Sequence, residues 1–176
     1  MQIQIHLNGT DRSFDVHPGT LLIELLRSDG LFSVKHSDET GDSGNDGVLI
    51  DGVLINSSIY LAAQAHKRSV MTVEALGTPE NLHPIQVAFV ETGAIQCGYC
   101  TPAMILSAYE LIANNPEPGE AEVRDALSGI LCRCTGYAKP VEAILLAARR
   151  MKEEGHGISG GRQEDPPGRR HEVSLR

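Results

Sequence analysis

Two tight pairs of cysteines are the feature that most constrains what this chain can fold into. The sequence reads CGYC at Cys97–Cys100 and CRC at Cys132–Cys134, and these are all of its 4 cysteines. Two close pairs with none left over predict four thiolates that converge on one centre. A structural zinc ion, a [2Fe–2S] cluster and two disulfides would each use such a set, and the spacing alone does not separate zinc from iron–sulfur.

The rest of the composition narrows the class of protein. The N-terminal MQIQIHLNG alternates polar and apolar residues, and no stretch approaches the roughly 20 apolar residues of a membrane span. We therefore expect an uncleaved, cytoplasmic protein with no membrane span, in which thiols stay reduced and disulfides are disfavoured. The net charge of −8 argues against nucleic-acid binding, which needs clustered lysine and arginine.

The hydrophobic pattern changes along the chain. Up to about residue 57 it favours strands, with alternation at Ile3, Ile5 and Leu7 and a hairpin turn at Asp51-Gly52. A helix is expected after Thr20 as its N-cap, and from about residue 58 onward the spacing is helical over 59–66, 83–92, 119–131 and 140–152. Thr101-Pro102 is typical of an N-cap and first position of a further helix, which Asn115-Pro116 should end. Unpaired N–H groups at the start of that helix would stabilise a thiolate at Cys100.

Two strings of the sequence resemble a known family. IQCGYCTPAMILSAYELIANNPEP and ALSGILCRCTGYAKPVEAI are similar to the helical-bundle domain of the small iron–sulfur subunits of xanthine dehydrogenase-type molybdenum hydroxylases, and the resemblance extends over residues 2–152. It implies an α+β fold, with a β-grasp domain like that of plant ferredoxins at 1–78 and a helical-bundle domain at 79–154. The remaining residues, 155–176, are expected to form a flexible tail.

The resemblance also assigns a site. It implies that Cys97, Cys100, Cys132 and Cys134 bind one [2Fe–2S] cluster beside the molybdopterin of a large subunit. The same comparison places Gln96 and Cys134 against the pterin. For Gln96 a second interpretation stays open, namely a polar residue that caps a local turn.

The N-terminal half departs from the family pattern. Family members hold a second, outer cluster there, with cysteines spaced C-x4-C-x2-C and a fourth further on. Asp38, Ser43, Asp46 and Ser58 occupy those positions in this chain. A serine hydroxyl is a very weak acid and carboxylates prefer harder cations, so we expect no iron–sulfur cluster here. We expect the acidic loop to be solvated, with Ca²⁺, or Zn²⁺ held through His36, as the alternative.

Loss of the outer cluster leaves three functions open. The first is an electron-transfer subunit with one cluster, in a molybdopterin-dependent oxidoreductase with a large molybdopterin subunit and a medium FAD subunit. The second is a structural iron–sulfur subunit of a redox-neutral or bifunctional hydratase, which adds water to an activated double bond. The third is a zinc-binding assembly module. In each case we expect the chain to have no catalytic residues of its own.

Overall fold

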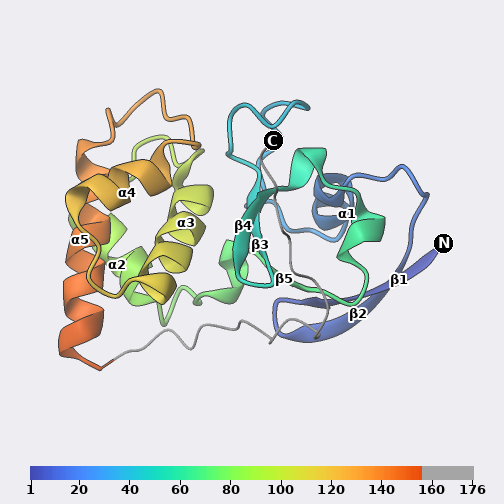
Figure 1. The fold of residues 1–176 in the computed structure, drawn as a ribbon, viewed down its shortest axis with the longest axis horizontal. Coiled ribbons are helices and arrows are strands. Elements are labelled where there is room, and N and C mark those ends of the chain that lie inside the picture. Colours follow the sequence, from blue (N-terminus) through green and yellow to red (C-terminus); the bar gives the residue numbers. More distant parts are fainter. Residues whose placement is uncertain (156–176) are drawn as a thin grey trace, which may run out of the picture.

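A mixed five-stranded sheet and a bundle of helices lie side by side (Figure 1). The computed structural model describes residues 1–155, and the expected tail lies almost wholly outside them. The strand order is β2-β1-β5-β3-β4, and the strand bounds are Gln2–Leu7 for β1, Thr10–Asp15 for β2, Gly47–Ile50 for β3, Val53–Asn56 for β4 and Ser69–Met71 for β5. This arrangement confirms the α+β fold class.

Two tight turns build the sheet from the alternating sequence. In β1 the side chains of Ile3, Ile5 and Leu7 are buried and their neighbours are exposed, so one face of the strand packs on the core. The β1–β2 turn and the β3–β4 turn each place two consecutive residues at positive φ, with φ of 50° at Asp51 and 82° at Gly52 in the second. That geometry matches the twist of antiparallel strands, which confirms the predicted hairpin at Asp51-Gly52.

The central strand β5 was not expected, because helical spacing was predicted from residue 58 onward. Only Val70 in this strand is fully buried, and a strand of three residues is too short to show an alternating pattern. It pairs parallel with β1 and antiparallel with β3, and so joins the two hairpins into one sheet. The predicted helix over 59–66 is also wrong, because the segment holds two short 3₁₀ turns, Ser57–Ile59 and Ala62–Ala65.

The helices mostly begin within two residues of their expected starts. Helix α1 covers Leu22–Ser28, and the Glu24 carboxylate accepts a hydrogen bond from the N–H of Leu21, so the N-cap is Leu21 and not Thr20. In the second half, Thr101 is the first residue of its helix and Cys100 is the N-cap. The bounds are Pro84–Glu91 for α2, Thr101–Asn114 for α3, Glu120–Leu127 for α4 and Ala138–Glu153 for α5.

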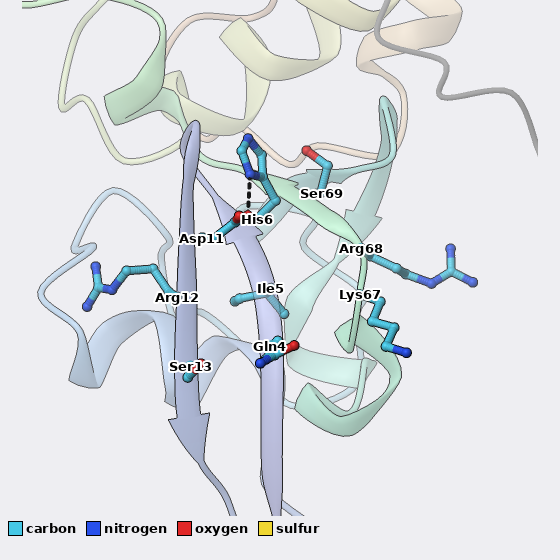
Figure 2. A pocket seen from close by; sticks show the side chains of 9 residues that line it. All are labelled: Gln4, Ile5, His6, Asp11, Arg12, Ser13, Lys67, Arg68 and Ser69. Atoms are coloured by element: carbon cyan, nitrogen blue, oxygen red, sulfur yellow. Dashed lines mark hydrogen bonds and ion pairs between the residues drawn. The ribbon is translucent and has the colours of Figure 1, made fainter.

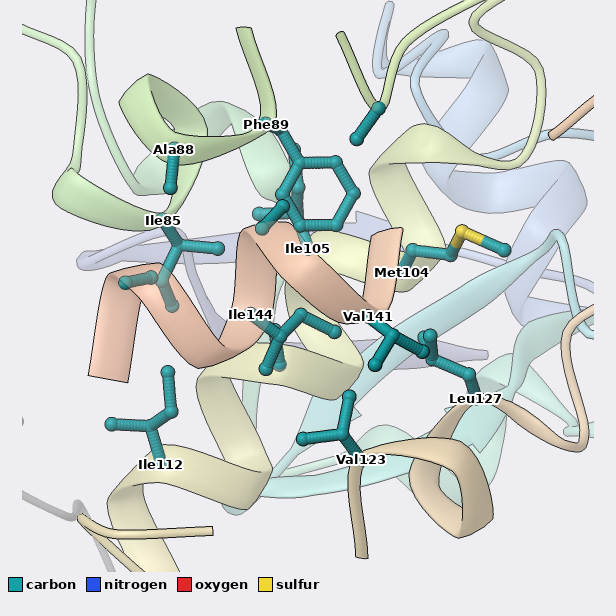
Figure 3. Close-up of a cluster of buried hydrophobic side chains, with 14 of the residues drawn as sticks. Ile85, Ala88, Phe89, Met104, Ile105, Ile112, Val123, Leu127, Val141 and Ile144 are labelled. Atoms are coloured by element: carbon teal, nitrogen blue, oxygen red, sulfur yellow. The ribbon is translucent and has the colours of Figure 1, made fainter. Parts of the chain in front are cut away.

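Each half has its own hydrophobic core. Phe89, Met104 and Ile144 belong to the core of the helical bundle, where α2, α3, α4 and α5 pack together (Figure 3). A second core lies between the sheet and α1, around Ile5 and Leu26. The division of the chain at residue 78 stays a prediction, because Leu54 of the sheet also packs against the helical core.

The loop between α1 and β3 touches the loop between α4 and α5. Gly44 has φ of 65°, and a Cβ placed on it would lie 2.1 Å from the carbonyl oxygen of Gly129. Beside this contact, the N–H of Leu131 donates to the carbonyl of Ser43 at 2.8 Å. The two backbones therefore approach so closely that only glycine fits at position 44.

This contact gives a first prediction. Gly93 has a similar φ of 69° but nothing within 4 Å of its Cβ position, which makes Gly93→Ala the matched control. Gly93→Ala should lower the free energy of unfolding by roughly 1–2 kcal/mol, the cost of a left-handed alanine. Gly44→Ala should add about 1–3 kcal/mol of overpacking to that cost. Equal losses for the two variants, measured by urea denaturation of the full chain, would contradict the close approach.

Candidate metal centre

The four cysteines line one cavity. It has a volume of about 380 Å³, and its walls also include Asn45, Tyr99, Leu131 and Arg133. Cys100 is buried, Cys132 is half-buried, and Cys97 and Cys134 are exposed. All four thiols are free. The two motifs, far apart in the sequence, are therefore brought together as reduced ligands, and the disulfide alternative receives no support.

The thiols form two pairs, each with one cysteine from either motif. Cys100 lies beside Cys132, and Cys134 lies beside Cys97, close enough that each neighbour raises the pKa of that thiol. Within residues 1–155, no group of three or more His, Cys, Asp or Glu side chains is arranged to hold a single metal ion. A zinc ion needs four ligands around one point, whereas a [2Fe–2S] cluster takes four cysteines over two irons. Four thiols around one cavity can supply the ligands of either centre.

Burial and the neighbouring thiols shift the pKa values of three of the four cysteines. Burial, together with the hydrogen bond to Cys132, raises the pKa of Cys100 to about 12. The hydrogen bond with Cys97 raises the pKa of Cys134. Burial also acts to raise the pKa of Cys132, but hydrogen bonds from Thr135 outweigh it and the net shift is downward. Burial thus outweighs the place of Cys100 at the helix start, and the expected stabilisation of its thiolate by that helix start is not found.

Tyr137 holds the loop that carries Cys132. Its hydroxyl accepts a hydrogen bond from the N–H of Cys132 at 2.8 Å and donates to the carbonyl of Ile130 at 2.9 Å. Thr135 adds a contact between its hydroxyl and the sulfur of Cys132 at 3.0 Å. Neither residue was predicted from the sequence. Thr135 and Tyr137 both carry a hydroxyl, flank Gly136 and follow directly after the second cysteine pair. That pattern is the signal that could have indicated their role.

The other cysteine loop meets the start of α3. Cys100 is the N-cap of that helix, and Gly98 has φ of 81°, a left-handed conformation that lets the chain turn between the two cysteines. Gln96 is exposed next to Cys97, and its side chain makes no hydrogen bond to any described residue. The alternative in which Gln96 caps a local turn therefore receives no support, and its contact with a pterin stays a prediction.

The positions expected to have lost cluster ligands form two Asp–Ser pairs. The Asp38 carboxylate accepts from the N–H of Ser43 at 3.0 Å, and the Asp46 carboxylate accepts from the N–H of Ser58 at 2.6 Å. A hydrogen bond from the Ser43 hydroxyl, joined by backbone N–H groups of the loop, lowers the pKa of Asp38 to about 2. His36 lies 3.9 Å from Glu39. Asp38 is thus used as a backbone acceptor, and neither a Ca²⁺ nor a Zn²⁺ grouping is found in the described part of this loop.

A larger hollow of about 610 Å³ lies on the exposed face of the sheet, away from the cysteines (Figure 2). Several of its charged side chains are already in ion pairs. His6 binds Asp11 at 2.8 Å within the hollow, while Arg12 and Arg68 bind carboxylates outside it. This hollow therefore brings together no reactive or ligating set. No helix in residues 1–155 is long and apolar enough to cross a membrane.

Four free thiols at one cavity of a helical bundle define a candidate cysteine-ligated metal protein, and comparisons with known proteins identify the family. Residues 72–145 match the [2Fe-2S] binding domain family. The nicotinate dehydrogenase small FeS subunit of Eubacterium barkeri is 42% identical over 149 residues, which cover 84% of this chain and 95% of that one. The crystal structure of quinoline 2-oxidoreductase from Pseudomonas putida 86 has a TM-score of 0.83 and 40% identity, over 87% of this chain and 96% of that one.

In one relative, the part that is similar to this chain is a small portion of a much longer protein. The aldehyde oxidoreductase of Megalodesulfovibrio gigas is 38% identical over 152 residues, which cover 84% of this chain but only 17% of that one. The chain belongs to the iron–sulfur subunits of the xanthine dehydrogenase family of molybdenum hydroxylases.

The pKa of Asp38 gives a second prediction. The folded-state pKa, about 2, lies below the ordinary value of 3.8. The stability that this group contributes is therefore fully present above the unfolded-state pKa and is lost as the pH falls through the folded-state pKa. Asp38→Asn should be less stable than the parent chain at neutral pH, and the difference in unfolding free energy should shrink between about pH 5 and pH 2. A difference that stays constant over this range would contradict the assignment.

Proposed function

We propose that this chain is the electron-transfer subunit of a molybdopterin-dependent oxidoreductase complex and that it carries one [2Fe–2S] cluster, here called the inner cluster. The observation that carries the proposal is the set of four free thiols, paired across two motifs around one cavity. Relatives named as dehydrogenases and oxidoreductases support the reaction class. Cys97 and Cys134 would bind one iron, and Cys100 and Cys132 the other.

When bound, the cluster would accept and release one electron at a time. The surrounding chain decides from which side electrons could reach the cluster. Cys97 and Cys134 are exposed, so one side of the centre faces the surface of the subunit. Cys100 is buried behind them at the start of α3, and the helical core excludes water from that side. The subunit would therefore exchange electrons through the face with the two exposed cysteines.

We assign this face to the large molybdopterin-binding subunit. The exposed thiols share their cavity with Tyr99, Leu131 and Arg133, and Leu131 is 56% exposed although it is apolar. Gln96 is exposed directly before Cys97. An exposed leucine and tyrosine at the rim of a redox centre suit a partner that covers them. Gln96 and Cys134 would then lie against the pterin. A medium FAD subunit is the proposed acceptor, the assembly is assigned to the cytoplasm, and this subunit supplies no catalytic residue itself.

The two Asp–Ser pairs favour a second candidate, the redox-neutral or bifunctional hydratase. A complex that adds water to a double bond exports no electrons, so it would not need an outer cluster. The inner cluster would then serve as a structural brace. The zinc module is the weakest candidate, since residues 72–145 match the [2Fe-2S] binding domain family.

Iron content gives a third prediction. The purified complex should contain about two irons for each copy of this chain and, when reduced, a single [2Fe–2S] species by electron paramagnetic resonance. Cys134→Ser should lose this signal because one of four ligands is gone. Ser58→Ala is the matched control at an emptied position, since the Ser58 hydroxyl has no hydrogen-bond partner in residues 1–155, and it should keep both irons. Two magnetically distinct clusters, or zinc in place of iron, would sink the proposal.

A fourth prediction separates the oxidoreductase from the hydratase. Replacing Asp38, Ser43, Asp46 and Ser58 with cysteine together should rebuild an outer cluster. In an oxidoreductase this should speed turnover with artificial or flavin-linked acceptors. In a hydratase the native rate should not change, and the reaction should proceed with no acceptor at all. A threefold variant that keeps Ser58 is the control, because its ligand set is incomplete and it should gain no iron beyond the parent value.

A further inference from the structure

The loop at 38–46 holds the backbone next to the inner cluster. The carbonyl of Ser43 accepts from the N–H of Leu131 at 2.8 Å, and the side-chain amide of Asn45 donates to the carbonyl of Leu131 at 3.3 Å. Leu131 directly precedes Cys132, and both Asn45 and Leu131 line the cysteine cavity. The position of Cys132 therefore depends on a segment that belongs to the sheet half of the molecule.

Asp38 in turn sets the shape of this loop. Its Oδ1 accepts from the N–H groups of Thr40, Gly41 and Asp42 at 3.1, 2.6 and 3.2 Å. Its Oδ2 accepts from the N–H of Ser43 at 3.0 Å. Consecutive N–H groups that point at one spot form a nest that needs an anion at its centre. Without the carboxylate, these four donors would lose their common acceptor and the loop would lose its fixed turn.

Asp46 fixes the other end of the loop. Its side chain is 1% exposed, its Oδ2 accepts from the N–H of Ser58 at 2.6 Å, and its carbonyl accepts from the hydroxyl of Ser57 at 2.6 Å. These bonds join the loop to the end of β4. The other carboxylate oxygen of Asp46 and the hydroxyl of Ser58 are buried and find no partner within residues 1–155, so a bridging water is expected between them.

We propose that Asp38 and Asp46 are positioning residues for the inner cluster. Their carboxylates hold the 38–46 loop as an internal anionic brace, and the loop fixes Leu131 and with it Cys132. The acidic residues act on the protein's own backbone N–H groups and not on a metal ion. This inference rests on the proposed function, because it takes the inner cluster as the group being positioned.

The experiment compares Asp38→Ala with Asp42→Ala in the full chain within its complex. Asp42 lies in the same loop, is exposed, and its carboxylate contacts only the hydroxyl of Thr40 at 2.5 Å, so its variant removes the same charge without emptying the nest. The readouts are the rate of iron loss to a chelator and the electron paramagnetic resonance spectrum of the reduced cluster. Asp38→Ala should lose iron several-fold faster and show a changed spectrum, whereas Asp42→Ala should match the parent chain.

A second pair of variants covers the case in which Asp38→Ala does not fold. Asp38→Asn and Asp46→Asn each keep one side-chain oxygen acceptor and should lose iron at rates between those of the parent and the alanine variant. Parent rates and spectra in Asp38→Asn, Asp46→Asn and, if it folds, Asp38→Ala would overturn the positioning role. Iron content tests the proposed function separately: about two irons per chain in the parent supports it, whereas about four would sink it whatever the variants do.

Discussion

The backbone contact between the 38–46 loop and the segment before Cys132 is the interaction on which the rest of the molecule depends. It includes the close approach of Gly44 to Gly129 and the hydrogen bond from Leu131 to Ser43. Neither half could hold the four thiols alone in this way, because the helical half supplies the sulfurs and the sheet half fixes one of the two loops that carry them. The sheet half is therefore part of the metal centre even though it contributes no cysteine.

Under the proposed function, this dependence gives a reason for the β-grasp half of the fold to be kept without a cluster of its own. A domain that only carried a second cluster could be lost along with that cluster. Here the same loop also touches the cavity of the remaining centre, through Asn45 and Leu131. Two aspartates and two serines hold this loop through hydrogen bonds, and they are of similar size to the cysteines that the resemblance to the family implies at these positions.

The sequence was informative where local chemistry decides the structure. Asp51-Gly52 identified a hairpin because few other dipeptides tolerate two positive φ angles, and Pro102 marked a helix start because proline lacks an N–H. It failed at β5, where three residues become a strand only because β1 and β3 lie on either side. It also failed at Tyr137, whose role depends on a loop that folds back on itself. The pairing of thiols across the two motifs could not be predicted from the sequence either, because it follows from tertiary packing.

The pairing of one cysteine from each motif has a consequence for the maturation of the protein. Cys97 pairs with Cys134 and Cys100 with Cys132, and the helices α3 and α4 separate the two motifs along the chain. A nascent chain released only as far as α4 would present half of the ligands for each iron. Under the proposed function, both irons therefore have their full set of ligands only after the segment beyond α4 has been synthesised.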